Sequence, residues 1–191
     1  ILEGSEIEER SPKVLQSFAQ GLASLMERGF ERHLRPEEAN AVLIDAEENP
    51  KSKYKGIAGD MLSDVGEWLS LAMLRVGDTL GLYWDPNIEF RNGVYVPKDG
   101  RLEYSRRETF DVKVVPSERF VPLGRLPGQV VKSLYSRPYS KLPKRVREES
   151  GVLIPSEGVL RPCGRGFFDD FVVDGDYDFG AGRGVRERRQ A

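Results

Sequence analysis

Apolar residues recur every three or four positions along the first third of the chain, which is the spacing of one helical face. The first such pattern follows Ser11-Pro12, a serine that suits a helix N-cap and a proline that suits the first helical position, and it ends near Leu34. A second pattern covers residues 37–48, and a third covers residues 57–72. Residues 1–77 are therefore predicted to form a segment of three helices, with the first and third packed together.

The spacing changes to strict alternation after Gly77, and alternation predicts strands. The runs 88–90 and 94–96 flank Asn92-Gly93, and this arrangement is the strongest short-range signal for a β-hairpin. Residues 78–116 are therefore predicted to form an antiparallel β-meander of four or five strands that packs on the helices. Its later strands are expected at 102–104 and 110–114.

The last third of the chain carries no continuous pattern. Prolines punctuate it, short helices are expected at 129–135 and 144–149, and residues 180–191 are rich in Gly and Arg like a tail. Long stretches with little structure of their own suit a segment that lies across a partner. Residues 117–191 are therefore predicted to be an irregular, partly helical docking arm and tail. The predicted fold class is α+β, with an N-terminal three-helix segment, a central antiparallel β-meander and an extended Pro/Gly/Arg-rich C-terminal third.

Charge is distributed unevenly along this sequence, although the formal net charge is only −2. Residues 1–75 carry 14 acids and 9 bases, a net of −5, whereas residues 119–165 carry 10 bases and 3 acids, a net of +7. The near-neutral total argues against general nucleic-acid binding. The asymmetry indicates interaction surfaces, including contacts between unlike ends of two copies.

The single cysteine, Cys163, rules out an intrachain disulfide. No signal peptide is visible, and no apolar run is long enough to span a membrane. We therefore expect an intracellular protein of a reducing compartment, with an organelle or a virion as open alternatives. No P-loop, dinucleotide or nucleophile-elbow motif occurs, so no cofactor is predicted and a non-enzymatic role is favoured.

Two residues are candidates for nucleophilic chemistry. His33, the only histidine, is expected at the C-terminus of the first helix, where a cationic imidazole is favourable and structural. Cys163 lies between Arg161 and Arg165, and such an electropositive neighbourhood can lower the pKa of a thiol. A Cys–His pair stays open, because its members need only be close in space.

Acidic residues suggest two weak cation sites. Asp60, Asp64 and Glu67 share one stripe of the third predicted helix, an arrangement more typical of a solvent-exposed face than of a metal site. The second is an acidic segment with the alternate spacing of a calcium loop, but it lacks the glycine and glutamate that an EF-hand needs, so it predicts a solvated loop. Its members are Asp169, Asp170, Asp174, Asp176 and Asp178.

A basic and aromatic stretch over residues 132–147 is the strongest candidate for binding. Cations interleaved with rings are used both by surfaces that dock on acidic proteins and by single-stranded nucleic-acid grooves. The predicted partner-binding residues are Lys132, Tyr135, Arg137, Tyr139, Lys141, Lys144, Arg145 and Arg147.

The sequence therefore favours a structural or scaffold subunit of a larger protein assembly that docks on protein partners or on copies of itself, with a viral-type assembly as one open alternative. The alternative is a nucleic-acid-associated module that uses residues 132–147. A third hypothesis is an enzyme without a local motif, which requires a deep pocket that holds acids with shifted pKa values.

Overall fold

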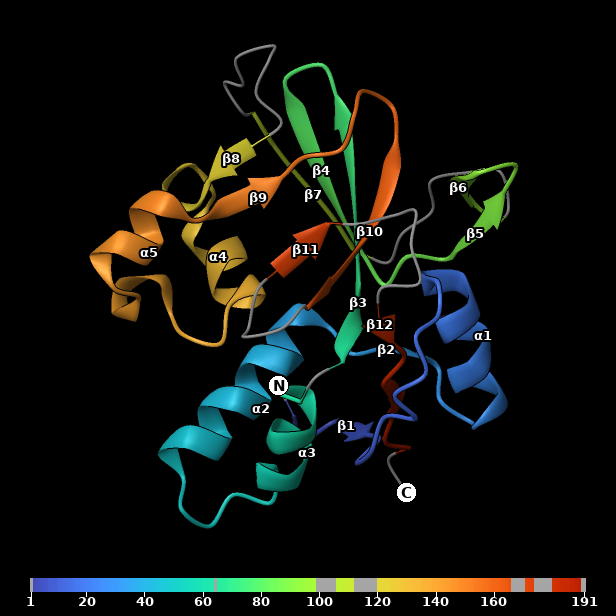
Figure 1. The fold of residues 1–191 in the computed structure, drawn as a ribbon, viewed down its shortest axis with the longest axis vertical. Coiled ribbons are helices and arrows are strands. Elements are labelled where there is room, and N and C mark those ends of the chain that lie inside the picture. The colour runs from blue at the N-terminus through green and yellow to red at the C-terminus, as the bar shows by residue number, and fades with distance from the viewer. Residues whose placement is uncertain are drawn as a thin grey trace.

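The computed structural model describes residues 2–63, 65–98, 106–111, 120–165, 171–173 and 180–189. Its helices gather around a largely antiparallel sheet, which confirms the predicted α+β class (Figure 1). In these residues no helix is both long and apolar enough to cross a membrane.

Strand β3 (Gly66–Val76) is the centre of the main sheet. Its first nine residues are buried, so the strand has apolar surroundings on both faces. It pairs antiparallel with β4 on one side and β10 on the other, and β12 adds a short parallel pairing at its start. The remaining strands of this sheet are β4 (Thr79–Trp84), β7 (Arg106–Asp111), β10 (Leu160–Arg165), β11 (Phe171–Val173) and β12 (Gly180–Ala181).

The helix predicted over residues 57–72 is wrong in its second half. Helix α3 (Lys55–Met61) ends early, and β3 begins at Gly66. A continuous run of apolar residues fits a buried helix and a central strand equally well, because neither has a polar face to give it a period. Sheet pairing with β4 and β10 selects the strand.

The two helices before α3 differ in how well local signals place them. Helix α2 (Pro36–Glu48) confirms the second predicted helix, with Pro36 in its first turn and the Arg35 backbone N–H donating to Glu38 Oε2 at 2.9 Å. Helix α1 (Phe18–Glu27) is shorter than predicted, because Ser17 rather than Ser11 forms its capping box. The residues beyond α1 form strand β2 (Arg32–His33) instead of a continued helix.

The predicted hairpin is confirmed as β5 (Ile88–Arg91) and β6 (Val94–Pro97). Asn92 and Gly93 have φ angles of 51° and 80°, as a tight turn of this type requires. The pair forms a sheet of its own beside the main one, so the predicted meander is not one continuous sheet. The strand expected at 102–104 lies outside the described residues.

The C-terminal third differs most from its prediction. Its short helices are present as α4 (Gly128–Leu134) and α5 (Lys144–Glu149). The expected docking arm, however, contributes β10 to the main sheet, beside β3, and it also forms the separate ribbon of β8 (Phe120–Pro122) and β9 (Gly151–Leu153). The divisions at 77/78 and 116/117 therefore do not separate independent units, because β10 pairs with a strand from the first third.

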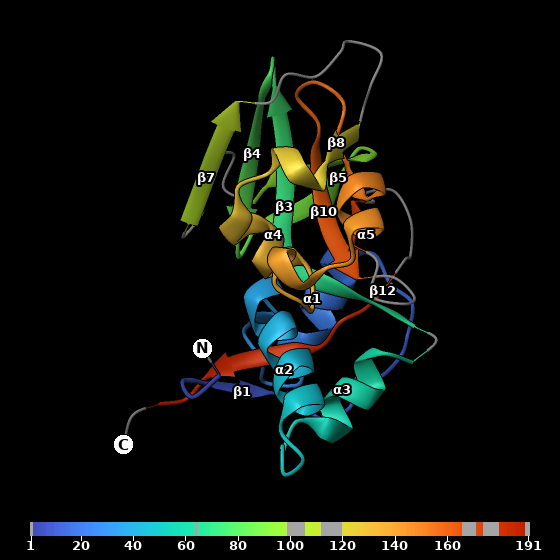
Figure 2. The ribbon, with the colours of Figure 1, turned by 90° about the vertical axis from the view of Figure 1, so that its left-hand side faces the viewer.

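The expected tail is also part of the fold. Strand β13 (Gly184–Glu187) lies between β1 (Ser5–Ile7) and β2, so the two ends of the chain meet in one small sheet (Figure 2). A Cβ atom at Gly184 would lie 2.2 Å from the ring of Phe30, which shows how closely the backbone of this strand approaches the ring. Glycine is needed here for close packing rather than for flexibility.

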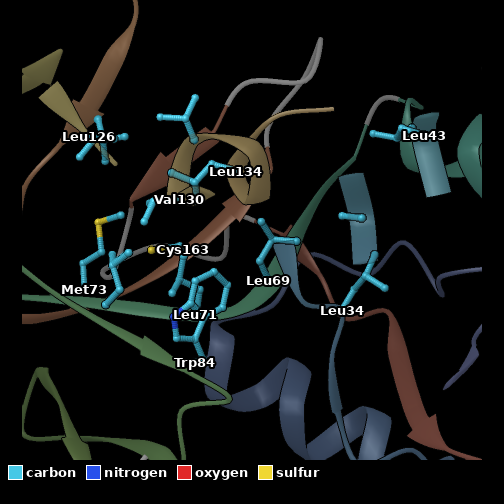
Figure 3. Packing of buried hydrophobic residues seen from close by; sticks show 14 of the residues in the cluster. Leu34, Leu43, Leu69, Leu71, Met73, Trp84, Leu126, Val130, Leu134 and Cys163 are labelled. Atoms are coloured by element: carbon cyan, nitrogen blue, oxygen red, sulfur yellow. The ribbon is translucent and has the colours of Figure 1, made fainter. Parts of the chain in front are cut away.

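Apolar side chains form two clusters on either side of β3. The larger cluster joins α2, α3 and α4 to the sheet, with Leu69, Leu71 and Trp84 near its centre (Figure 3). The smaller cluster packs α1 against the other face through Phe18 and Trp68. Each of these side chains is at most 2 % exposed, so the core is closed on both faces of the central strand.

Candidate docking surface

The segment that follows β8 is attached along helix α2. Asn40 Nδ2 donates a hydrogen bond to the backbone carbonyl of Lys132, and α4 contacts α2 at this point. Further along, exposed ion pairs continue the attachment in the same direction. They join Arg137 Nη2 to Glu47 Oε1 at 2.6 Å and Lys141 Nζ to Glu48 Oε1 at 3.5 Å.

An apolar groove of about 480 Å³ opens between α2, α3 and residues 136–137. Leu43 and Ala46 are three positions apart on α2, and Ala58 and Leu62 are four positions apart on and just beyond α3, so each pair shares one helical face. Leu62 is 57 % exposed, whereas Leu43 and Ala58 are only 7 % and 6 % exposed. The groove therefore presents apolar surface to solvent.

Charged side chains surround the groove. Glu47, Lys55 and Arg137 line it, and Lys55 Nζ donates to the Pro50 carbonyl at 2.6 Å. The side chains of Glu47 and Arg137 are 57 % and 52 % exposed. Exposed pairs of this kind contribute at most about 1 kcal/mol, so Arg137 can exchange Glu47 for a carboxylate of a partner at little cost.

The tyrosines of the predicted binding stretch do not present free rings. Tyr135 and Tyr139 are partly buried and pack against the larger core cluster. The guanidinium of Arg147 lies over the Tyr139 ring, 5.7 Å from its centroid. These rings help to hold residues 135–139 on the core, which leaves only part of each ring for stacking on bases.

Apart from Arg147, the cations of the same stretch fall into two groups. Lys132, Arg137 and Lys141 follow α2 beside the groove, and among the described residues Lys132 has no carboxylate within ion-pair distance. Lys144 and Arg145 instead pair with acids of their own helix α5. These pairs are Lys144–Glu148 at 3.6 Å and Arg145–Glu149 at 2.8 Å.

His33 lies in β2 and is fully buried, so the expected cationic imidazole at a helix C-terminus is wrong. Its Nε2 lies 3.3 Å from the Phe18 carbonyl, which fixes the proton on Nε2 because a carbonyl only accepts. Gly21 and Gly182 pack against the ring. Burial lowers the pKa of His33 to about 4, and the charge of Arg28 adds to this.

Cys163 is fully buried in β10, within the larger core cluster. Burial raises the pKa of its thiol well above the usual range, opposite to the lowering that the neighbouring arginines suggested. The thiol therefore stays protonated near neutral pH, and a Cys–His nucleophilic pair has neither a thiolate nor an accessible imidazole.

The acids of the third predicted helix do not form a solvent-exposed face. Glu67 is on β3, only 4 % exposed, and both it and Asp60 bind the guanidinium of Arg183. Asp64 and the acidic segment at 169–178 lie outside the described residues. Across the residues that the structure does describe, no three His, Cys, Asp or Glu side chains are grouped to hold a metal ion.

The groove was not predicted from the sequence. Leu43, Ala46 and Ala58 belong to the ordinary apolar stripes of α2 and α3, and nothing in their spacing shows that a groove lies beside them. The exposed position of Leu62 follows from the end of α3 at Met61, which the sequence did not place. Only the basic flank, residues 132–141, was identified in advance.

No protein-family description matches this chain, and no curated protein matches it either. Among solved structures, it is similar to one from work on the accommodation of massive sequence variation in Nanoarchaeota by the C-type lectin fold. That chain shares 16 % sequence identity with this one, the match covers 98 % of this chain and 100 % of the other, and the TM-score is 0.46. This similarity is weak, and the α+β class stands on the helices and strands described above.

Proposed function

We propose that this chain is a non-enzymatic scaffold subunit that docks on a protein partner through the apolar groove and its basic flank. The groove between α2, α3 and residues 136–137 carries the proposal, because it exposes Leu62 beside Leu43 and Ala46. An uncovered apolar patch rimmed by charge is typical of a protein interaction site.

The charges around the groove define the class of partner. Two cations, Lys55 and Arg137, line the groove with one acid, Glu47, which pairs with Arg137. Just beyond them Lys141 pairs with Glu48. The surplus favours an acidic segment that places apolar side chains in the groove and carboxylates beside Arg137 and Lys141. Such complementary charge speeds encounter and selects among partners.

The nucleic-acid alternative has less support. A single-stranded groove needs unpaired cations and exposed rings together. Here Tyr135 and Tyr139 pack on the core, and Lys144 and Arg145 pair with acids of α5.

Selection of peptides from a random displayed library on the purified chain tests the proposal. Selected peptides are expected to combine apolar residues with Asp or Glu, and to lose at least about tenfold in affinity for Leu62→Glu and Arg137→Glu. Lys144→Glu, which changes the same charge on α5, is the matched control and should bind as the wild type does. Peptides without acidic residues, or peptides that bind Leu62→Glu unchanged, would contradict the proposal.

Light scattering of the same variants tests whether a second copy occupies the groove instead. A wild-type dimer that becomes a monomer in Leu62→Glu would replace the separate partner with a copy of this chain. A wild-type monomer supports the separate partner.

A further inference from the structure

A second hollow lies at the end of the molecule where the two chain termini meet. One lobe, of about 630 Å³, lies between residues 9–13 and α3, and the other, of about 500 Å³, lies between β1, Phe30 and Tyr54. The lobes share Glu9, Lys53 and Ile57 in their linings, so they are adjacent, and together they are called the cleft. Figure 2 shows β1 and α3 at this lower end of the molecule.

Most charges that line the cleft neutralise one another. Lys13 Nζ pairs with Asp60 Oδ1 at 2.9 Å, which accounts for both. Two more acids that line the cleft form ion pairs with arginines. Glu8 pairs with Arg28 at 2.8 Å, and Glu6 pairs with Arg186 at 2.7 Å.

Three cations remain against one acid. Among the described residues, Arg10, Lys53 and Arg188 have no carboxylate within ion-pair distance, and the only lining carboxylate without a cation is Glu9. Lys53 lies where the two lobes join, with its Nζ 5.1 Å from the centroid of the Tyr54 ring. The cleft therefore carries surplus positive charge around its centre and on both sides of it.

The smaller lobe combines apolar and aromatic residues with charged ones. Phe30, Tyr54 and Ile57 line it beside Lys53 and Arg188. A hollow that is lined by both rings and cations suits molecules that combine a flat apolar group with an anionic one. The lobes are also of the size that holds small ligands in proteins.

We propose that this cleft binds a small organic anion that carries a flat aromatic group, with its charge on Lys53, Arg10 and Arg188 and its ring in the smaller lobe. This site is separate from the docking groove and does not depend on the proposed function, because α3 contributes different residues to each, Ile57 and Gly59 here and Ala58 there.

Larger side chains at either of two glycines would fill part of the cleft without straining the backbone. Cβ atoms built at Gly56 and Gly59 meet no other atom within 4 Å, and neither residue has a positive φ. Both lie in α3, where a side chain favours the helix over glycine. Gly59→Leu therefore occupies the larger lobe while the fold is retained, and Gly128→Leu in α4, where a Cβ also meets open space, is its matched control.

Calorimetric titration with adenosine monophosphate, adenosine and inorganic phosphate tests the proposal, with anilinonaphthalene sulfonate as a second aromatic anion. Adenosine monophosphate is expected to bind saturably and at least about tenfold more tightly than adenosine or phosphate, because each of these lacks one half of the recognised molecule. Lys53→Gln and Gly59→Leu should each weaken it about tenfold or more, whereas Lys98→Gln and Gly128→Leu should not.

Thermal unfolding of each variant shows whether its fold is intact, so a loss of binding is interpreted only where the unfolding temperature is kept. If neither aromatic anion binds saturably, or if both bind Lys53→Gln and Gly59→Leu as they bind the wild type, the proposal is overturned. Peptide binding at the groove is expected to be unchanged in both variants, which separates this result from the test of the docking function.

Discussion

Arg183 and Glu67 are 116 positions apart in the sequence and form a buried, two-pronged ion pair. Arg183 Nε lies 3.1 and 3.0 Å from the two carboxylate oxygens of Glu67, and its Nη2 lies 2.7 Å from Oε1. Nη2 also donates to Asp60, and Nη1 donates to the carbonyls of Glu8 and Glu9. Every N–H group of this guanidinium thus has an acceptor. The Arg183 side chain therefore joins the C-terminal segment to α3, to β3 and to the residues that follow β1.

Removal of one member of this pair should destabilise the chain strongly. Arg183→Met leaves the Glu67 carboxylate buried without the cation it binds, and we expect a loss of about 3–5 kcal/mol in the free energy of unfolding, measured with urea. Glu67→Gln should cost less, because Arg183 keeps its pair with Asp60. Arg186→Gln is the control on the same strand, because its pair with Glu6 is exposed, and it should change the unfolding free energy little. Equal losses in all three variants would show that burial of Arg183 has no special role.

His33 should make the fold sensitive to mild acid. Its pKa is about 4 in the folded chain, and an unfolded histidine titrates near 6.5. As the pH falls from about 6.5 toward 4, the unfolded chain binds a proton that the folded chain does not, so stability falls. We expect a loss of about 2 kcal/mol between pH 7 and pH 5.

The chain has a single histidine, so His33→Leu provides the control for this acid sensitivity. Urea unfolding of this variant should change much less over the same interval of pH than that of the wild type. Matching pH profiles would assign the sensitivity to other groups. Asp60 and Asp85 affect stability only at lower pH, because the pKa of each carboxyl group is lowered in the folded chain. Burial raises both pKa values, but hydrogen bonds from Lys13 and Arg183 lower that of Asp60 and a hydrogen bond from Arg35 lowers that of Asp85.

A methyl group at Gly184 should disturb the closure of the two chain ends. Its Cβ would lie 2.2 Å from the Phe30 ring, so the ring or the strand has to move, and such overpacking costs about 1–3 kcal/mol. Gly4→Ala, where a Cβ meets no atom within 4 Å, should leave the thermal unfolding temperature unchanged. Addition of Phe30→Ala to Gly184→Ala should recover part of the loss, and no recovery would place the strain elsewhere.

Cys163 should be inert in the folded protein. The thiol is fully buried and its pKa is raised, so a disulfide reagent such as dithiobis(nitrobenzoate) is expected to react only as fast as the chain unfolds. Reaction in urea should yield one thiol per chain. Rapid labelling of the native chain at neutral pH would contradict the buried position of this residue.

The parts of the fold that the sequence predicted are those with local signals. Pro36 placed the start of α2, Asn92-Gly93 placed the β5–β6 turn, and α5 was recognised at 144–149. Strand β3 was missed because a run buried on both faces has no period that distinguishes strand from helix. Strand β13 was missed because its glycines and arginines look like a tail, whereas ion pairs and close backbone packing hold it in place.

The candidate site shows the same limit. The basic residues 132–147 were found from composition, yet their partners come from elsewhere in the chain. Glu47 and Glu48 on α2 hold Arg137 and Lys141, and the core takes up the tyrosine rings. Charge that looks free in one segment is often neutralised by another segment in the folded chain. Only the folded chain shows that the groove beside this segment is apolar and uncovered.

The most direct test of the docking function is the map of amide chemical-shift changes on the labelled chain when a selected acidic, apolar peptide is added. We expect the changes to lie in the C-terminal half of α2, in α3 and in residues 136–141. Helix α5 and the β5–β6 hairpin should show none. Changes centred on α5, or spread without relation to Leu62, would contradict a docking site in the groove.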